Sequence, residues 1–97
     1  MTELSDYSFS KCYMLREMVI PDTVGTVQRY CFENCKGMKK YYFLSIWPPK
    51  LTAINAFTGI TKDCKIYVPS GMLKAYQEAD NWSFYASYME EMEGDVP

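Results

Sequence analysis

Four cysteines are the residues of this sequence whose chemistry best suits metal binding or redox work. They occupy positions 12, 31, 35 and 64, and the chain contains no histidine. No two cysteines have the two-residue gap that is typical of a zinc knuckle or a thiol–disulfide motif. The lack of histidine removes the most common general base and the most common metal ligand. We therefore expect no catalytic residue, no metal site and no cofactor, and a chain that is not an enzyme.

A repeat organises the elements that would have to position any site. Three pairs of residues share a separation of 23 positions: Tyr7 with Tyr30, Phe9 with Phe32, and Cys12 with Cys35. Units of this length stack on one another, because each buries its apolar side against the next. A third unit is less regular, since Phe57 follows Phe32 by 25 residues. We predict one domain over residues 1–97, with stacked coils at about residues 4–26, 27–53 and 54–69.

Each predicted coil contains a helical turn followed by a strand. The strands end in β-forming residues directly before Pro21 and Pro69, and proline cannot donate to a sheet ladder. Two sets of apolar residues occupy equivalent positions: Leu15, Met18 and Ile20 in the first coil, and Met38, Tyr41 and Phe43 in the second. We expect these columns to face a common interior.

The repeat ends at Ser70, and helical spacing takes its place. We expect Ser70 to cap a helix, because its hydroxyl can accept a backbone N–H. The residues Met72, Leu73, Tyr76 and Ala79 form one apolar stripe, and Trp82, Tyr85, Ala86, Met89 and Met92 form a second. The sequence thus predicts two short helices over residues 70–93 that cover the exposed edge of the last coil.

The repeat places Cys12 above Cys35, close enough for a disulfide if the two side chains are suitably oriented. The third coil has Ile60 in the same column, 25 residues after Cys35. An apolar residue there indicates that the position serves packing. We therefore expect buried free thiols rather than a zinc site or a disulfide.

The outward-facing strand positions are the first candidate binding site. Parallel neighbouring strands lie about 4.8 Å apart, so equivalent side chains should form one patch. Tyrosine and lysine together suit an acidic peptide or a glycan. The plainer alternative is an ordinary solvated sheet face. The candidate residues are Arg16, Val19, Lys39, Lys40, Tyr42, Lys65 and Tyr67.

The segment from Leu44 to Leu51 is longer than its counterpart in the first coil and contains Trp47, Pro48 and Pro49. It could protrude as a binding loop with Trp47 as the contact residue. The alternative, which we favour, is that Ile46 or Trp47 folds back over the coil edge, because loops often pin themselves with an aromatic side chain.

The overall charge gives no general attraction to polyanions. The formal net charge is −2 and the isoelectric point is about 5.0, so we expect no nucleic-acid partner. No run of about 18 apolar residues is present, so we expect no membrane insertion. The first coil begins near Met1 with nothing above it, which predicts either a longer parent protein or a homodimer through this end.

The repeat resembles the BspA-type leucine-rich repeats, whose unit runs I-x-x-Y-A-F-x-x-C-x-x-L-x-x-V-x-I-P-x-x-V. Residues 7–24 follow that pattern, and residues 48–82 are similar to the last coil and cap of the family. The resemblance implies an α/β fold, a right-handed solenoid with a small parallel sheet and a C-terminal helical cap.

The same resemblance implies a bacterial surface or secreted protein that binds host or matrix components, and it implies no catalytic activity. We therefore expect a module for protein binding or adhesion whose ligand is a protein or a glycan. The alternative is an intracellular structural protein that self-associates as an assembly scaffold. A cell-surface or secreted location is expected if the chain is part of a longer protein, and a cytoplasmic one if Met1 is the true start.

Overall fold

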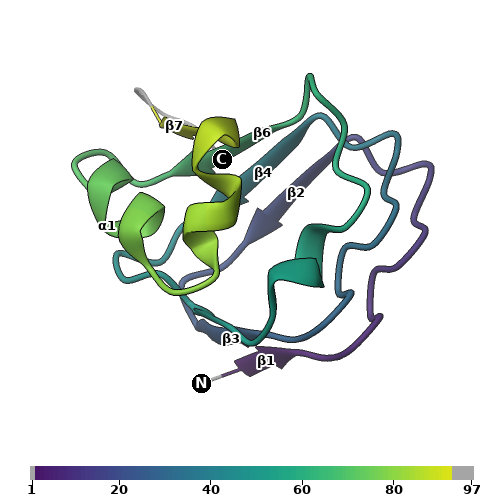
Figure 1. The fold of residues 1–97 in the computed structure, drawn as a ribbon, viewed down its shortest axis with the longest axis horizontal. Helices are drawn as coiled ribbons and strands as arrows, with labels where there is room; N and C mark the ends of the chain where they lie inside the picture. The colour runs from purple at the N-terminus through teal and green to yellow at the C-terminus, as the bar shows by residue number, and fades with distance from the viewer. Residues whose placement is uncertain (1, 93–97) are drawn as a thin grey trace.

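The computed structural model describes residues 2–92, whose strands form two parallel sheets (Figure 1). The first sheet has the strand order β1-β3-β5, and the second has the order β2-β4-β6-β7. The strands are β1 (Thr2–Leu4), β2 (Glu17–Ile20), β3 (Val24–Val27), β4 (Lys40–Phe43), β5 (Lys50–Leu51), β6 (Lys65–Val68) and β7 (Met89–Glu91). The helices are the 3-10 helices η1 (Ile54–Phe57) and η2 (Trp82–Tyr88) and the α-helix α1 (Leu73–Glu78).

The register of the second sheet follows the spacing of the repeat. Met18 of β2 pairs with Tyr41 of β4, which in turn pairs with Ile66 of β6. Ile20 pairs with Phe43 in the same way. These side chains alternate with outward-facing ones and belong to the core or pack against it. The predicted apolar columns are therefore confirmed.

The turns that precede the strands also stack (Figure 1, right-hand side). The ring of Phe32 lies between the rings of Phe9 and Phe57, with centroid distances of 5.7 and 5.3 Å and interplanar angles of 11°. The N–H of Phe9 donates to the carbonyl of Cys31 at 2.9 Å, and the N–H of Phe32 donates to the carbonyl of Ala56 at 2.8 Å. Rings and backbone thus repeat together at Phe9, Phe32 and Phe57, and we refer to the parts of the chain around these three turns as the first, second and third repeats.

The position that Lys11, Asn34 and Gly59 share adopts a left-handed backbone in all three turns, and Tyr7 and Tyr30 share a second such position in the first two turns. Lys11, Asn34 and Gly59 have φ values of 59°, 54° and 85°. The N–H of Lys11 donates to the carbonyl of Glu33, and the N–H of Asn34 donates to the carbonyl of Thr58, both at 2.7 Å. The turn therefore directs these N–H groups toward the following repeat, although non-glycine residues adopt this conformation at some energetic cost.

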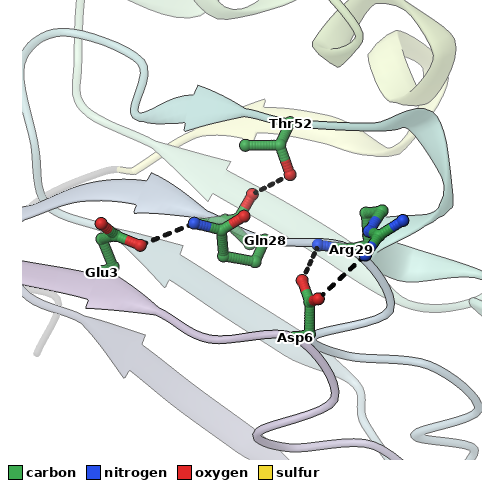
Figure 2. A network of polar contacts seen from close by, with 6 residues as sticks. Glu3, Asp6, Gln28, Arg29 and Thr52 are labelled. Atoms are coloured by element: carbon green, nitrogen blue, oxygen red, sulfur yellow. Dashed lines mark hydrogen bonds and ion pairs between the residues drawn. The ribbon is translucent and has the colours of Figure 1, made fainter.

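Polar side chains join the first two repeats beside the three-stranded sheet. Figure 2 shows Gln28 Nε2 donating to Glu3 Oε1 at 2.6 Å, and Arg29 bound to Asp6 through its backbone N–H and its guanidinium, at 3.1 and 3.2 Å. Exposed pairs of this kind stabilise a fold by only about 0–1 kcal/mol each. We conclude that the main effect of these four residues is to fix the alignment of the repeats, and that they add little to the stability of the fold.

Ser70 does not cap the first helix of the C-terminal segment. Helix α1 begins at Leu73, and Met72 occupies its N-cap position without a side-chain hydrogen bond. The N–H of Met72 instead donates to the carbonyl of Pro69 at 3.0 Å, and Gly71 between them has a φ of 84°. This tight turn separates Ser70 from the helix, so the predicted cap is wrong.

The second predicted helix is shorter than its apolar stripe indicated. Met89 lies in β7 and pairs with Ile66 of β6, while Met92 donates its N–H to the carbonyl of Val68 at 2.9 Å. An open strand edge leaves backbone groups unpaired, and β7 covers the edge of β6. The prediction of helix up to Met92 is therefore wrong, and residue 93 of the predicted cap lies outside the described residues.

Candidate functional site

The outer face of the second sheet carries the predicted aromatic column. Val19 pairs with Tyr42, and Tyr42 pairs with Tyr67, on three adjacent strands. The rings of Tyr42 and Tyr67 stack with centroids 5.2 Å apart and an interplanar angle of 15°. The structure thus brings together the three residues that the spacing predicted to be neighbours.

Tyr42 is not an exposed contact residue, which corrects the prediction for this position. Only 6% of its surface is exposed, because neighbouring strands flank it on both sides. Val19, at 39%, is exposed, and Tyr67 is half-buried. The ring of Tyr42 therefore packs against one side of the Tyr67 ring. Tyr67 and Val19 form the part of this column that a partner can reach.

The charged column beside the tyrosines is mixed in sign rather than basic. Glu17 pairs with Lys40, and Lys40 pairs with Lys65. Lys65 Nζ lies 3.0 Å from Glu90 Oε2, and this contact raises the pKa of Lys65. Lys40 forms no ion pair with any residue in the range 2–92. Lys40 is therefore the cation of this column that is available to an anionic partner.

The two flanking cations are engaged within the protein. Lys39 Nζ lies 2.7 Å from Asp63 Oδ2, and its hydrogen bond lowers the pKa of that carboxyl group. Arg16 Nη1 donates to the carbonyl of Tyr13 at 3.1 Å. Both side chains remain exposed. A partner would have to compete with these contacts, so Arg16 and Lys39 are weaker candidates than Lys40.

Glu90 also belongs to this face, although the repeat pattern does not predict it. It lies in β7 and pairs with Tyr67 of β6. The apolar spacing in residues 70–93 predicts helix, and a helical Glu90 would have no place in the sheet. Its carboxylate adds a negative charge at the end of the tyrosine column.

Trp47 and Ile46 protrude from the segment between β4 and β5. They are 74% and 62% exposed, so the prediction that one of them folds back over the edge is wrong. The space that they would have covered is filled by Tyr76 and Trp82, both buried, whose rings are 5.4 Å apart. The C-terminal segment thus supplies the aromatic cover, and the loop leaves its own aromatic side chain in solvent.

Hydrogen bonds hold both ends of this loop. The hydroxyl of Tyr76 donates to the carbonyl of Ser45 at 2.6 Å, and the indole N–H of Trp82 donates to the carbonyl of Pro49 at 2.7 Å. Inside the loop, Ser45 Oγ donates to the carbonyl of Trp47 at 2.7 Å. A loop fixed at both ends presents Trp47 in a defined position, which lowers the entropic cost of binding.

The four cysteine side chains pack in the core or against it. Cys31, Cys35 and Cys64 are buried and Cys12 is half-buried, all as free thiols. Burial raises the pKa of Cys31 and of Cys64 to about 11, and it also raises the pKa of Cys35. Within residues 2–92, no three His, Cys, Asp or Glu side chains are grouped in a way that could hold a metal ion.

Two parallel sheets, few helices and strands that pair at the repeat spacing are consistent with a leucine-rich repeat protein. A family model described as the BspA-type leucine-rich repeat region matches residues 1–93. The chain therefore belongs to the BspA-type leucine-rich repeat family. No curated protein matches the chain.

Membership of this family suggests a repeat module for protein interaction or adhesion. Repeats of this type are generally associated with the cell surface. Across residues 2–92, none of the helices has the length and apolar character needed to span a membrane.

Proposed function

We propose that the chain is a non-enzymatic binding module of a bacterial surface-type protein, and that it binds a protein ligand through the outer face of the second sheet. In this proposal the repeats form a right-handed solenoid, and residues 70–93 close its C-terminal end. In this proposal the protein lies at the cell surface or outside the cell, as repeats of this family generally do.

The observation that carries the proposal is the stacked pair Tyr42 and Tyr67 beside Lys40. The ring of Tyr67 is held flat on a buried partner, so little side-chain entropy is lost when a ligand stacks on it. Lys40 and Lys65 are cross-strand neighbours, and of the two only Lys65 forms an ion pair in the described chain, although Glu17 is the other cross-strand neighbour of Lys40. The ammonium groups of Lys40 and Lys65 repel each other, and a ligand carboxylate bound next to Lys40 would offset this repulsion. An acidic protein segment fits this face.

Trp47 supplies a second contact in this proposal. Its indole ring is exposed on a loop that the hydrogen bonds to Ser45 and Pro49 hold in place. Rigid, exposed aromatic side chains are enriched among the residues that contribute most to protein interfaces. We expect Trp47 to insert into a recess of the same partner or of a second one.

The test is the double variant Tyr67→Ser with Lys40→Glu, assayed on an array of acidic peptides and an array of anionic glycans. The matched control is Tyr13→Ser with Lys62→Glu, which changes an exposed tyrosine and an exposed lysine outside the candidate site. We expect the sheet variant to lose peptide binding at least tenfold and the control to retain it. Equal binding by both variants would overturn the proposal. Binding to glycans alone would show that the ligand is a carbohydrate and not a protein.

The second candidate function is a self-associating scaffold, and the open edges of β1 and β2 favour it. Neither strand has a neighbour on its N-terminal side among the described residues. Tyr7, Tyr13 and Met14 are exposed at this end. Unpaired edges with exposed apolar side chains are sites where two chains can join.

One backbone feature constrains such a dimer. No described donor reaches the carbonyls of Asp6, Ser8 and Ser10, whose counterparts in the second repeat accept hydrogen bonds from the first. Two copies related by a twofold axis through this turn would bring acceptors against acceptors, so pairing must use the strand edges instead. Light scattering of the purified protein tests this function: we expect a dimer that Met14→Lys dissociates, and a monomer at all concentrations would exclude it.

A further inference from the structure

A cleft of about 550 Å³ lies between η1 of the third repeat and η2 of the C-terminal segment. Its walls include Ile54, Ile60, Phe84 and Tyr88. Ile54 and Phe84 are 48% and 64% exposed, which is unusual for large apolar side chains on facing walls. The outer face of the second sheet contributes no residue to this lining, so the cleft is separate from the site proposed above.

Comparison of the three turns shows that a backbone N–H group in the cleft has no acceptor. At the left-handed position of each turn, the N–H of Lys11 donates to the carbonyl of Glu33, and the N–H of Asn34 donates to the carbonyl of Thr58. Gly59 occupies the same position in the third repeat and lines the cleft. Its N–H donates no hydrogen bond to any residue in the described chain. Comparison with Lys11 and Asn34 indicates that the N–H of Gly59 points toward the C-terminal side, where a carbonyl oxygen could accept its hydrogen bond.

The C-terminal segment satisfies part of this edge. The hydroxyl of Tyr85 in η2 donates to the carbonyl of Ile54, and a backbone hydrogen bond with Phe57 partly offsets the rise that burial causes in the pKa of Tyr85. Tyr85 thus replaces the contacts that another repeat would make near Phe57. Its side chain leaves the next position, Gly59, open.

A second unmet polar group lies in the same cleft. Asn55 Oδ1 is fully screened from solvent and accepts no hydrogen bond within the part of the chain that the structure describes. A buried acceptor without a partner typically costs about 1–3 kcal/mol. The cleft therefore combines one free acceptor, one free backbone donor and two exposed apolar side chains.

We propose that this cleft binds an extended peptide. A backbone carbonyl of the peptide accepts the N–H of Gly59, as the carbonyls of Glu33 and Thr58 do for the preceding turns. The side chain of Asn55 turns on binding so that its Oδ1, which is screened from solvent in the unbound protein, accepts a backbone N–H of the peptide. An apolar side chain of the peptide packs between Ile54 and Phe84. An amide group carries both the acceptor and the donor that the cleft requires, whereas an apolar ligand would leave both groups unpaired.

The experiment is a titration of the ¹⁵N-labelled protein with the capped dipeptide acetyl-leucyl-leucine amide, followed by ¹H–¹⁵N correlation spectra. We expect a saturable downfield shift of the Gly59 amide and of the Asn55 side-chain amide. Phe84→Ser should weaken binding at least tenfold, and Asn55→Ala should weaken it severalfold. The matched control is Ile46→Ser, which removes an exposed apolar side chain from the loop after β4 and should not change the affinity.

Two results would overturn the proposal. One is the absence of a saturable shift at Gly59 up to the solubility limit of the peptide. The other is equal affinity of the Phe84→Ser and Ile46→Ser proteins once their spectra show that both are folded. Because no residue of the outer sheet face is changed, neither result bears on the function proposed for that face.

Discussion

The indole N–H of Trp82 donates a hydrogen bond to the carbonyl oxygen of Pro49, 2.7 Å away. Trp82 is only 1% exposed, and its ring also packs edge-on against Phe43, with centroids 5.0 Å apart. One side chain therefore joins the C-terminal segment, the loop after β4 and the core. The arrangement of these three parts depends on it.

Trp82→Phe tests this dependence, because it keeps an aromatic ring and removes the N–H donor. The carbonyl of Pro49 would be left without its partner, so we expect the free energy of unfolding to fall by about 1–3 kcal/mol. Urea denaturation followed by circular dichroism measures the change. Trp47→Phe is the control, and we expect no more than about 0.5 kcal/mol there because Trp47 is exposed. Equal losses in the two variants would show that the hydrogen bond contributes nothing.

Gly59→Ala should destabilise the third repeat for two reasons. The residue has a φ of 85°, and a Cβ placed there would lie 2.1 Å from Asn34 Oδ1. Gly71 has a φ of 84° with nothing within 4 Å of the same position, so Gly71→Ala isolates the cost of the backbone conformation. We expect a loss of about 1–2 kcal/mol for Gly71→Ala and a larger one for Gly59→Ala, as measured by thermal denaturation.

The steric part of the Gly59 effect can be separated with a second substitution. Asn34→Gly removes the side chain that a new Cβ would meet. The double variant should therefore lose less stability than the sum of the two single variants. Strict additivity would mean that Asn34 moves aside at no cost.

The cysteines should differ in their reactivity toward iodoacetamide. At pH 8 the buried thiols of Cys31 and Cys64 are protonated, since burial raises their pKa to about 11. Cys12 is half-buried and should react first. Mass spectrometry after timed alkylation measures the order. Modification of Cys31 or Cys64 at the rate of Cys12 would contradict the burial of these side chains.

The same thiols predict a loss of stability in base. A thiol has an ordinary pKa of 9.0, and that of folded Cys31 is about 11, so folding favours the neutral form. The stability that the neutral Cys31 thiol contributes is fully present below pH 9, and it is lost as the pH rises from about 9 to about 11. We expect Cys31→Ala to make the free energy of unfolding fall less steeply over this range. An unchanged slope in urea titrations at pH 8, 9, 10 and 11 would contradict the shift.

The fold was predictable where the repeat itself carried the information. Equal spacing placed Val19, Tyr42 and Tyr67 in one column, because parallel strands that pair in register keep equivalent residues side by side. The exposure of each member was not predictable from spacing. Tyr42 has neighbours on both sides and is buried, whereas Val19 lies at the edge of the sheet and is exposed.

The C-terminal segment was predicted less well, because it is not periodic with the repeats. The spacing of Trp82, Tyr85 and Met89 is compatible with a helix, but the open edge of β6 draws Met89 into a strand. The outward position of Trp47 follows from the same segment, since Tyr76 and Trp82 already fill the interior beside the loop. Local patterns could not indicate which of several aromatic residues would occupy that space.

The turns that carry Phe9 and Phe32 direct their N–H groups toward the C-terminal end and their carbonyls toward the N-terminal end. Peptide dipoles aligned in this way add together, as they do along a helix. The turn side of the molecule is therefore electrically polar along its length, with partial negative charge beside Asp6 and partial positive charge beside Gly59. A ligand that approaches this side would be oriented by the field before any side chain touches it.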